Sequence, residues 1–551
     1  MNKNKTFLYF ILPTVIAFCV VIGVYLGAYL SQNSVDKTII FPVNAKLKNS
    51  NKLNEILNFI EDMYVDTVNK GELTEISIAS ILSKLDPHSY YIPAKEFNEM
   101  NDPLEGNFQG IGVEFRINND TVMILSVIAN GPSEKVGLEA GDRIIKVGKK
   151  TIAGNGITNE NVIKLLKGPK GTKVNVSVAR KGIKKLIDYT ITRDEIPIFS
   201  IESPYMIDDE IGFIKINRFA KTTYGEFMSA TKKLLKSGMK DLIIDLRGNG
   251  GGVMGAATSI ADEFLAKDKM IVYTQGKSRN KEAFYATDRG ILEKTNIIIL
   301  INENSASASE ILAGAVQDND RGTIIGRRSF GKGLVQEQVM WPDGSALRLT
   351  VARYYTPSGR CIQKPYDDGM DNYNMESYNR YLNGELLSAD SIHFPDSLKF
   401  YTPLGKIVYG GGGIMPDVFV PIDTTLYSEY FGTVNRKGLL NDFTLSYMDN
   451  KRAEIEKKHT TVTDFASNFD AEKELFNQFI EYAKNNEVEP NDEQINISKP
   501  IIINRLKALV ARNIWGTSAF YQISNEFNNS YKKAIEEINN DSFKKEKLVY
   551  N

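Results

Sequence analysis

Hydrophobic and polar positions follow different periods in different parts of the chain. From residue 211 onward, short apolar runs rich in β-branched residues alternate with stretches of helical spacing, such as 225–236. Short runs of this kind predict buried strands, and their alternation with helices predicts an α/β domain with mainly parallel pairing. The predicted strands of this domain lie at 211–216, 241–246, 270–273, 297–301, 323–325, 334–340 and 346–355.

Residues 106–194 have a shorter period. Valines alternate with polar residues at 174–178, and a lysine–glycine turn leads into a second alternating run at 186–192. Alternation on both sides of a short turn predicts a β-hairpin. Together with further short strands and two helices, this pattern predicts a separate β-rich module.

The N-terminal region combines lysines with a long apolar run. Lys3 and Lys5 precede a charge-free stretch at 7–30, which is long enough to span a bilayer as a helix. Positive residues before the span predict a cytoplasmic N-terminus and an exported remainder. We therefore predict a protein anchored in the inner cell membrane, with its bulk on the periplasmic or extracytoplasmic side. A cleaved signal peptide is the alternative, although the run is long for one and no Ala-x-Ala site follows it.

These patterns divide the chain into six regions. They are a membrane segment at 1–30, a polar linker at 31–50, an N-terminal helical region at 51–105, the β-rich module at 106–194, the α/β core at 195–425 with a polar insert at 366–398, and a charged helical extension at 430–551.

Composition narrows the classes of function. The 551 residues carry a formal net charge of −1, which gives no electrostatic signal for nucleic-acid binding. The two cysteines, Cys19 and Cys361, are isolated, so neither a disulfide framework nor a cysteine metal site is predicted. We expect no cofactor and no metal. The three histidines are His88, His393 and His459.

Two glycine patterns imitate phosphate-binding motifs. Residues 250–255 fit G-x-G-x-x-G, but the next predicted strand does not end in the acidic residue that a dinucleotide ribose requires. Residues 326–332 fit the start of a P-loop, but Gly333 replaces the required serine or threonine and a strand pattern follows. Neither pattern therefore predicts nucleotide binding.

A serine and a lysine form the strongest catalytic candidate. Ser307 lies at the turn between the predicted strand 297–301 and a helical stretch, where the helix dipole favours negative charge. Lys332, flanked by glycines, follows the next predicted strand. A serine nucleophile needs a base, and no histidine lies in this part of the sequence, so a desolvated lysine is the candidate base.

Each residue also has a structural interpretation. Ser307 and Glu310 form the Ser-x-x-Glu pattern of a helix capping box. Lys332 fits a solvated loop lysine, because lysines are mostly exposed.

Five motifs occur in the order that one protein family uses. They are Asp-Leu-Arg-Gly-Asn-Gly-Gly-Gly at 245–252, Ser-Ala-Ser-Ala-Ser-Glu at 305–310, Ser-Phe-Gly-Lys-Gly-Leu-Val-Gln at 329–336, Tyr-Thr-Pro-Ser-Gly-Arg at 355–360 and Gly-Ile-Met-Pro-Asp at 413–417. Over roughly residues 50–425, the chain resembles the C-terminal processing peptidases, or tail-specific proteases. The β-rich module stands where this family carries a PDZ domain.

The resemblance assigns roles to individual residues. It implies that Ser307 is the nucleophile, Lys332 the general base and Gln336 a residue that orients the lysine. It makes Glu310 an accessory acid. The backbone N–H of Ala308, with that of Gly251 or Gly252, is the implied oxyanion hole. The loop Gly110-Ile111-Gly112-Val113 resembles the PDZ loop that binds a peptide C-terminal carboxylate, although Gln109 stands where a basic residue often precedes that loop.

The resemblance also implies a fold and an activity. The fold is an α/β protease core of the crotonase/ClpP-like kind with an inserted β-rich PDZ domain, an N-terminal helical region and a helical C-terminal extension. The activity is serine endopeptidase cleavage near the C-terminal tails of exported proteins. The expected partners are proteins or peptides with free C-termini and, through the N-terminal segment, the membrane; nucleic acid is not among them. The PDZ domain would capture or gate the substrate tail.

Two other functions compete with this one. A PDZ-bearing scaffold could bind tails without cutting them, but the complete set Ser307, Lys332 and Gln336 argues against it. A crotonase-like acyl-CoA enzyme would also use glycine N–H groups, but an exported chain with a PDZ-like module argues against that function.

Overall fold

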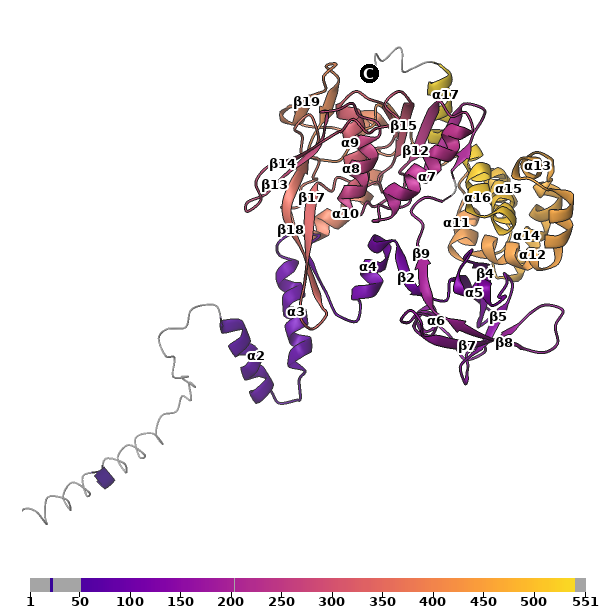
Figure 1. The fold of residues 1–551 in the computed structure, drawn as a ribbon, viewed down its shortest axis with the longest axis horizontal. Helices are drawn as coiled ribbons and strands as arrows, with labels where there is room; N and C mark the ends of the chain where they lie inside the picture. Colours follow the sequence, from indigo (N-terminus) through magenta and orange to yellow (C-terminus); the bar gives the residue numbers. More distant parts are fainter. Residues whose placement is uncertain (1–19, 23–50, 203, 541–551) are drawn as a thin grey trace, which may run out of the picture. The chain divides into compact units, whose positions relative to one another are not determined.

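The computed structural model describes residues 20–22, 51–202 and 204–540, and the chain divides into two compact units at 1–78 and 79–551 (Figure 1). The first unit contains α2 (Lys52–Met63) and the larger part of α3 (Lys70–Leu82). The predicted membrane segment at 7–30 lies outside the described residues, except for residues 20–22. Among the residues that the structure describes, no helix combines the length and apolar character that a membrane span requires.

A six-stranded sheet forms the centre of the second unit, and its pairing is parallel except at one edge. In spatial order its strands are β10 (Tyr205–Met206), β11 (Ile211–Lys215), β12 (Asp241–Asp245), β15 (Asn296–Ile301), β16 (Thr323–Gly326) and β21 (Val418–Phe419). The predicted strands at 211–216, 241–246, 297–301 and 323–325 are confirmed. Their continuous apolar runs agree with a sheet that is buried on both faces.

Side chains alternate between the two faces of this sheet. Ile244 and Ile299 pack in one cluster with three helices, α7 (Thr223–Lys236), α8 (Met254–Asp262) and α9 (Ala308–Asp318). Ile243 and Ile298 pack on the other face against the last helix, α17 (Asn529–Asn539). The period of two along each strand therefore supplies both hydrophobic layers.

A second sheet is antiparallel, which corrects part of the predicted pairing. It joins β1 (Tyr90–Ile92), β18 (Ala346–Tyr355), β13 (Met270–Gln275), β14 (Glu282–Tyr285) and β17 (Leu334–Met340). The predicted strands at 270–273, 334–340 and 346–355 form, but they do not continue the parallel sheet. Short loops join β13 to β14 and β17 to β18, and short loops permit only antiparallel pairing.

The β-rich module has its own sheet and core. The sheet runs β3 (Val113–Asn118), β4 (Thr121–Val127), β5 (Arg143–Val147), β7 (Lys173–Ala179) and β8 (Ile187–Thr192), with β6 (Lys150–Thr151) on β5. Two helices complete it, α5 (Pro132–Lys135) and α6 (Asn159–Leu166). The connections to the α/β core are α4 (Phe97–Glu105) and the paired strands β2 (Asn107–Gly110) and β9 (Asp194–Pro197). The predicted hairpin at 174–192 is β7–β8.

The predicted insert contains one helix and two short turns. They are α10 (Met370–Leu382), η1 (Ala389–Ser391) and η2 (Asp396–Leu398), and the hairpin β19 (Lys399–Tyr401) and β20 (Ile407–Tyr409) follows.

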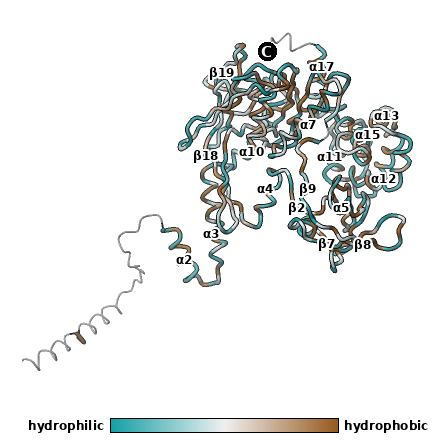
Figure 2. The backbone as a smooth tube through the Cα atoms, viewed as in Figure 1, coloured by the Kyte–Doolittle hydropathy of each residue, from teal (hydrophilic) through white to brown (hydrophobic). Residues whose placement is uncertain are grey.

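The C-terminal extension is helical in its described part, and its residues 430–523 contain a separate hydrophobic core. Its elements are α11 (Glu429–Arg436), α12 (Leu439–Lys458), α13 (Val462–Asn468), the π-helical turn η3 (Glu472–Phe476), α14 (Asn477–Asn485), α15 (Asp492–Trp515), α16 (Thr517–Ser524), η4 (Asn525–Phe527) and α17. Figure 2 shows hydrophobic positions interspersed with hydrophilic ones along these helices. That pattern is expected of helices with one buried and one solvated face.

Candidate active site

Ser307 occupies a strained turn between β15 and α9. Its φ of 56° and ψ of −113° place a non-glycine residue in a region that side chains rarely adopt. Such strain persists only where neighbouring structure enforces it, and it is concentrated at functional sites. Here the loop after β12 supplies the restraint, because the carbonyl oxygen of Asn249 accepts from Ala306 N–H at 3.0 Å and from Ser309 Oγ at 2.9 Å.

Glu310 joins this turn to the loop that carries Lys332. The side chain is 1% exposed. Its Oε2 accepts from the backbone N–H of Ser307 at 2.7 Å and from that of Lys332 at 2.9 Å. Its Oε1 accepts from Ser329 Oγ at 2.5 Å and from Gly331 N–H at 2.7 Å. Glu310, the expected accessory acid, therefore connects the backbones of the two candidate catalytic residues. Its bond to the Ser307 N–H is one half of the predicted capping box, and its bond to the Lys332 N–H is additional.

Tyr354, which lies outside the sequence motifs, makes a second connection between the serine turn and the lysine loop. The hydroxyl of Tyr354, on β18, lies 3.1 Å from the carbonyl oxygen of Ser307 and 2.9 Å from that of Lys332. The Tyr354 side chain is 1% exposed. The carboxylate and the hydroxyl together hold the serine turn and the lysine loop as one assembly.

The Lys332 amine faces a neutral partner. Its Nζ donates to Gln336 Oε1 at 3.1 Å. Burial lowers the pKa of Lys332 from its ordinary value, and the positive charge of Arg348 lowers it further. The negative charges of Asp86 and Glu310 oppose these effects. A lysine with a lowered pKa is neutral for a larger fraction of the time at working pH, which a general base requires.

The segment before β1 positions Gln336, which corrects the expectation about histidines. Gln336 Nε2 donates to the backbone carbonyl of His88. Asp86 fixes this carbonyl, because its Oδ1 accepts from the N–H of His88 and of Ser89, each at 2.8 Å. Its Oδ1 also accepts from Thr350 Oγ1 on β18 at 3.1 Å. His88 therefore lies beside Lys332 in the fold, although no histidine lies near that lysine in the sequence.

The imidazole of His88 is oriented by a different contact. Its Nε2 lies 2.7 Å from the hydroxyl of Tyr373, on α10. Burial, and then the positive charge of Lys332, lower the pKa of His88 from 6.5 to about 4. The ring is therefore neutral near pH 7, so it adds no charge beside the lysine.

The glycines after β12 allow a close approach to Ser307. A β-carbon at Gly251, whose φ is 97°, would lie 2.7 Å from Ser307 Cβ and 2.9 Å from Ala308 N. Gly252 forms a parallel bridge with Phe219, and a β-carbon there would lie 2.0 Å from the Phe219 oxygen. The Gly251 N–H donates to Asn249 Oδ1 at 2.8 Å, so in this conformation its hydrogen bond is to the protein.

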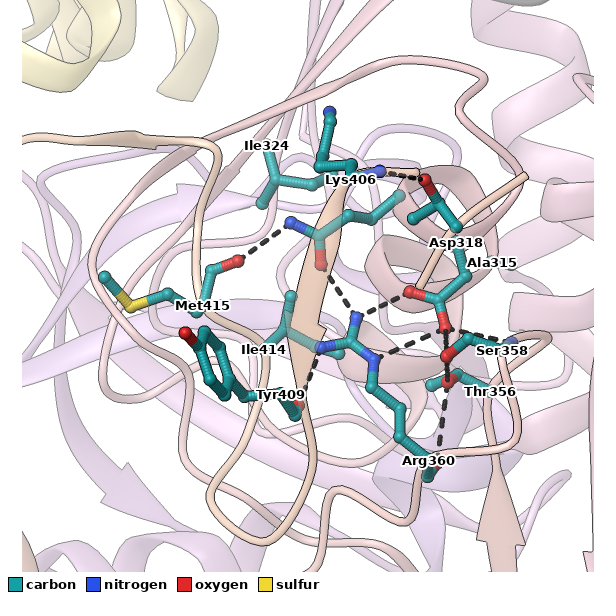
Figure 3. A network of polar contacts seen from close by, with 12 residues as sticks. Ala315, Asp318, Ile324, Thr356, Ser358, Arg360, Lys406, Tyr409, Ile414 and Met415 are labelled. Atoms are coloured by element: carbon teal, nitrogen blue, oxygen red, sulfur yellow. Dashed lines mark hydrogen bonds and ion pairs between the residues drawn. The ribbon is translucent and has the colours of Figure 1, made fainter. Parts of the chain in front are cut away.

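Two further motifs hold α9 from its other end. Arg360, which is fully buried, donates to Asp318 Oδ1 at 2.6 Å and to the Tyr409 carbonyl at 2.8 Å (Figure 3). Ser358 Oγ donates to Asp318 Oδ2 at 2.6 Å. Figure 3 also draws Met415, whose carbonyl accepts from Gln317 Nε2 at 2.8 Å. The motifs at 355–360 and 413–417 thus support the C-terminal end of α9, the helix whose N-cap residue is Ser307.

The predicted insert supports the lysine loop from outside. Arg380 on α10 donates to the carbonyl oxygen of Ser329 at 2.7 Å and to that of Phe330 at 3.2 Å. The side chain of Arg380 is 2% exposed. The polar composition of this region gave no indication that it would pack beside the site.

The predicted carboxylate loop lies in the β-rich module. Gly110 ends β2 and Val113 begins β3, while Ile111 is buried and its carbonyl accepts from Ser133 Oγ at 2.6 Å. Gly112 has a φ of 74°, which a glycine adopts without strain. The loop is therefore held at the start of the edge strand β3.

Comparisons with known proteins match three parts of the chain to families. Residues 210–370 match Peptidase family S41, residues 109–191 match the PDZ domain, and residues 430–516 match a family of unknown function (DUF8443).

Individual relatives extend the similarity beyond these matches. A "Carboxy-terminal-processing protease" of Bartonella bacilliformis is 37% identical over 62% of this chain and 79% of its own length. "Carboxy-terminal processing protease CtpB" of Bacillus subtilis is 33% identical over 62% of this chain and 72% of its own length. A solved structure, "Photosystem II D1 C-terminal processing protease", is 24% identical and is similar over 69% of this chain and 95% of its own, with a TM-score of 0.35.

Proposed function

The chain belongs to the carboxy-terminal processing proteases of Peptidase family S41 and is a serine-type peptidase with a PDZ domain, and from this premise we propose that it cuts protein tails with Ser307 as nucleophile and Lys332 as base. One observation carries the proposal. The Lys332 amine, whose pKa burial lowers, faces the neutral amide of Gln336 on a loop that Glu310 joins to the Ser307 turn.

The proposed reaction has two stages. Neutral Lys332 takes the proton from Ser307 Oγ as that oxygen attacks the scissile carbonyl carbon. The resulting Lys332 ammonium then protonates the departing amine, which leaves an ester between Ser307 and the substrate. In the second stage, Lys332 takes a proton from water, the hydroxide attacks the ester, and Ser307 regains its proton.

The negative oxygen that forms in each stage needs hydrogen-bond donors. We assign this role to the N–H of Ala308 and to one glycine N–H, from Gly251 or Gly252, because Gly251 brings its backbone against the serine turn and Gly252 follows it in the same loop. Gly252 is the favoured glycine, since the Gly251 N–H donates to Asn249.

The PDZ domain and the N-terminal segment determine how the protein would bind its substrates and where it would meet them. The domain would hold the substrate's terminal carboxylate at Gly110, Ile111, Gly112 and Val113. The segment at 7–30 would anchor the chain, so that the substrates are exported proteins. The crotonase/ClpP-like assignment of the core is likewise a proposal, supported by the parallel order β11-β12-β15-β16 with α9 packed on one face.

The test compares three full-length proteins on one peptide library. The wild type, Ser307→Ala and Lys332→Arg are each incubated with peptides that have free or amidated C-termini, and the products are identified by mass spectrometry. We expect cleavage by the wild type alone, with amidation acting mainly on KM because the tail contact is remote from the bond that breaks. Cleavage by Ser307→Ala would refute the nucleophile assignment.

The anchor is tested separately. A reporter that is active only after export is fused after residue 50. Activity of the reporter in the cytoplasm would contradict the proposed topology.

A further inference from the structure

The peptide-accepting strand of the PDZ domain has one unpaired side. β3 is the end strand of its sheet, and no strand within residues 51–202 and 204–540 pairs with its outer edge. A peptide whose carboxylate lies at Gly110 to Val113 would add to this edge as a further strand. Because the carboxylate would lie where β3 begins, the peptide would extend from there alongside β3 and run antiparallel to it.

The two faces of β3 have different surroundings. Val113, Phe115 and Ile117 pack against the PDZ core, which includes Val162 and Leu166 of α6. Residues alternate along a strand, so Glu114 and Arg116 point to the opposite face.

The C-terminal extension contacts that opposite face through two ion pairs. Glu114 Oε1 pairs with Arg512 of α15 at 2.8 Å, and Arg116 pairs with Asp442 of α12 at 2.8 Å. The side chains of Glu114 and Arg512 remain 45% and 41% exposed. The Arg512 and Glu114 side chains are therefore still accessible to a further charged group.

We propose that the C-terminal extension forms one wall of the tail-binding groove and that Arg512 and Asp442 select charge at two substrate positions. This inference rests on the proposed capture of tails by the PDZ domain. Neighbouring side chains on one face of paired strands lie about 5 Å apart. Tail residues that share the face of Glu114 and Arg116 would therefore contact the extension, and they would be two residues apart.

The two positions would differ in their charge preference when the extension is altered. The tail residue nearer the terminus would lie beside Glu114 and Arg512. Replacing Arg512 by glutamate leaves two negative charges there, which favours a basic tail residue. The tail residue two positions earlier would lie beside Arg116 and Asp442. Replacing Asp442 by lysine leaves two positive charges there, which favours an acidic tail residue.

The experiment measures peptide binding by fluorescence anisotropy to the full chain carrying Ser307→Ala, so that the peptide is not cut. Peptides with a free C-terminus carry Lys or Glu at one of the last five positions and are otherwise identical. With Arg512→Glu, we expect the ratio of the two Kd values to change about threefold toward lysine at one position, the effect of an exposed charge pair. With Asp442→Lys, we expect a similar change toward glutamate two residues earlier.

Two variants control for indirect effects. Lys499→Glu reverses a charge on the same helix that pairs with Glu472 at 2.6 Å inside the extension, and it should leave every ratio unchanged. Glu114→Arg combined with Arg512→Glu restores a local pair and should return the ratio toward that of the starting protein.

The outcomes separate this inference from its premise. Weaker binding of amidated peptides, with ratios that do not respond to Arg512→Glu or Asp442→Lys, would overturn the role of the extension alone. Equal binding of amidated and free peptides would overturn tail capture itself. If Arg512→Glu and Asp442→Lys changed the Kd ratios at adjacent tail positions, a wall formed by these two residues would be refuted. The same conclusion would follow if Lys499→Glu changed the ratios equally.

Discussion

The catalytic loops and the contact between the PDZ domain and the extension hold their charges in opposite ways. Glu310 is 1% exposed and accepts four hydrogen bonds, whereas Glu114 and Arg512 leave nearly half of each side chain in solvent. A buried charge that loses its partners costs several kcal/mol, while an exposed pair contributes about 0–1 kcal/mol. The first arrangement enforces one geometry, and the second allows adjustment without unfolding.

The strongest effect is expected at the base. Lys332→Arg should lower kcat/KM by about 10³-fold or more, because a guanidinium stays protonated and cannot accept the proton of Ser307. Peptide binding, measured by anisotropy, should change far less. Lys332→Met, which keeps an unbranched chain without charge, should be equally inactive. Turnover by the arginine variant above the Ser307→Ala background would show that another group is the base.

The second effect is expected at the buried carboxylate. Glu310→Gln places an amide group among four donors, so at least one N–H loses its acceptor, and we expect the free energy of unfolding to fall by about 3 kcal/mol. Activity should fall with it, since the same groups hold Ser307 and Lys332.

The matched comparison for this variant is Glu114→Gln at the exposed contact. It should change the unfolding free energy by no more than about 0.5 kcal/mol in the same urea titration. Equal losses in the two variants would remove the distinction between buried and exposed charges.

The third effect is a displacement of the pH profile. kcat/KM should rise with pH as Lys332 loses its proton and should reach a plateau above its lowered pKa. Asp86 raises this pKa and Arg348 lowers it. Asp86→Asn should therefore move the rise to lower pH, and Arg348→Gln should move it to higher pH. Shifts of the same sign would show that the profile reports another group.

The sequence predicted the elements around Ser307 because their signals are local. The run at 297–301 and the small residues after it indicate a strand that ends at a turn, and β15 with α9 has this form. The spacing of hydrophobic residues along the chain does not determine which strands become neighbours in a sheet. The run at 270–273 therefore seemed equivalent to the others, but its pairing with β18 places it in the antiparallel sheet.

The contacts that position Gln336 could not be predicted from the sequence, because they also join residues that are distant along the chain. Gln336 meets the His88 carbonyl across 248 positions of the chain, and Thr350 meets Asp86 across 264. No spacing pattern connects residues this distant. Residues 86–89 belong to the predicted N-terminal helical region, and only the tertiary fold shows that they position the glutamine.

The smallest effect is expected where the extension meets the PDZ domain beyond the groove. Asp449 on α12 pairs with Arg143 of β5 at 2.9 Å, and both side chains remain about a third exposed, at 29% and 37%. Asp449→Asn should cost about 0.5 kcal/mol, measured as reduced hydrogen-exchange protection of β5 at low salt. Because ions screen an exposed pair, the difference from the wild type should disappear near 1 M salt. Where the extension meets the parallel sheet, Ile538→Ala removes apolar contact, and its effect should persist at high salt. A loss in Asp449→Asn that salt leaves unchanged would mean that this contact is as rigid as the catalytic loops, and the contrast between the two regions would not hold.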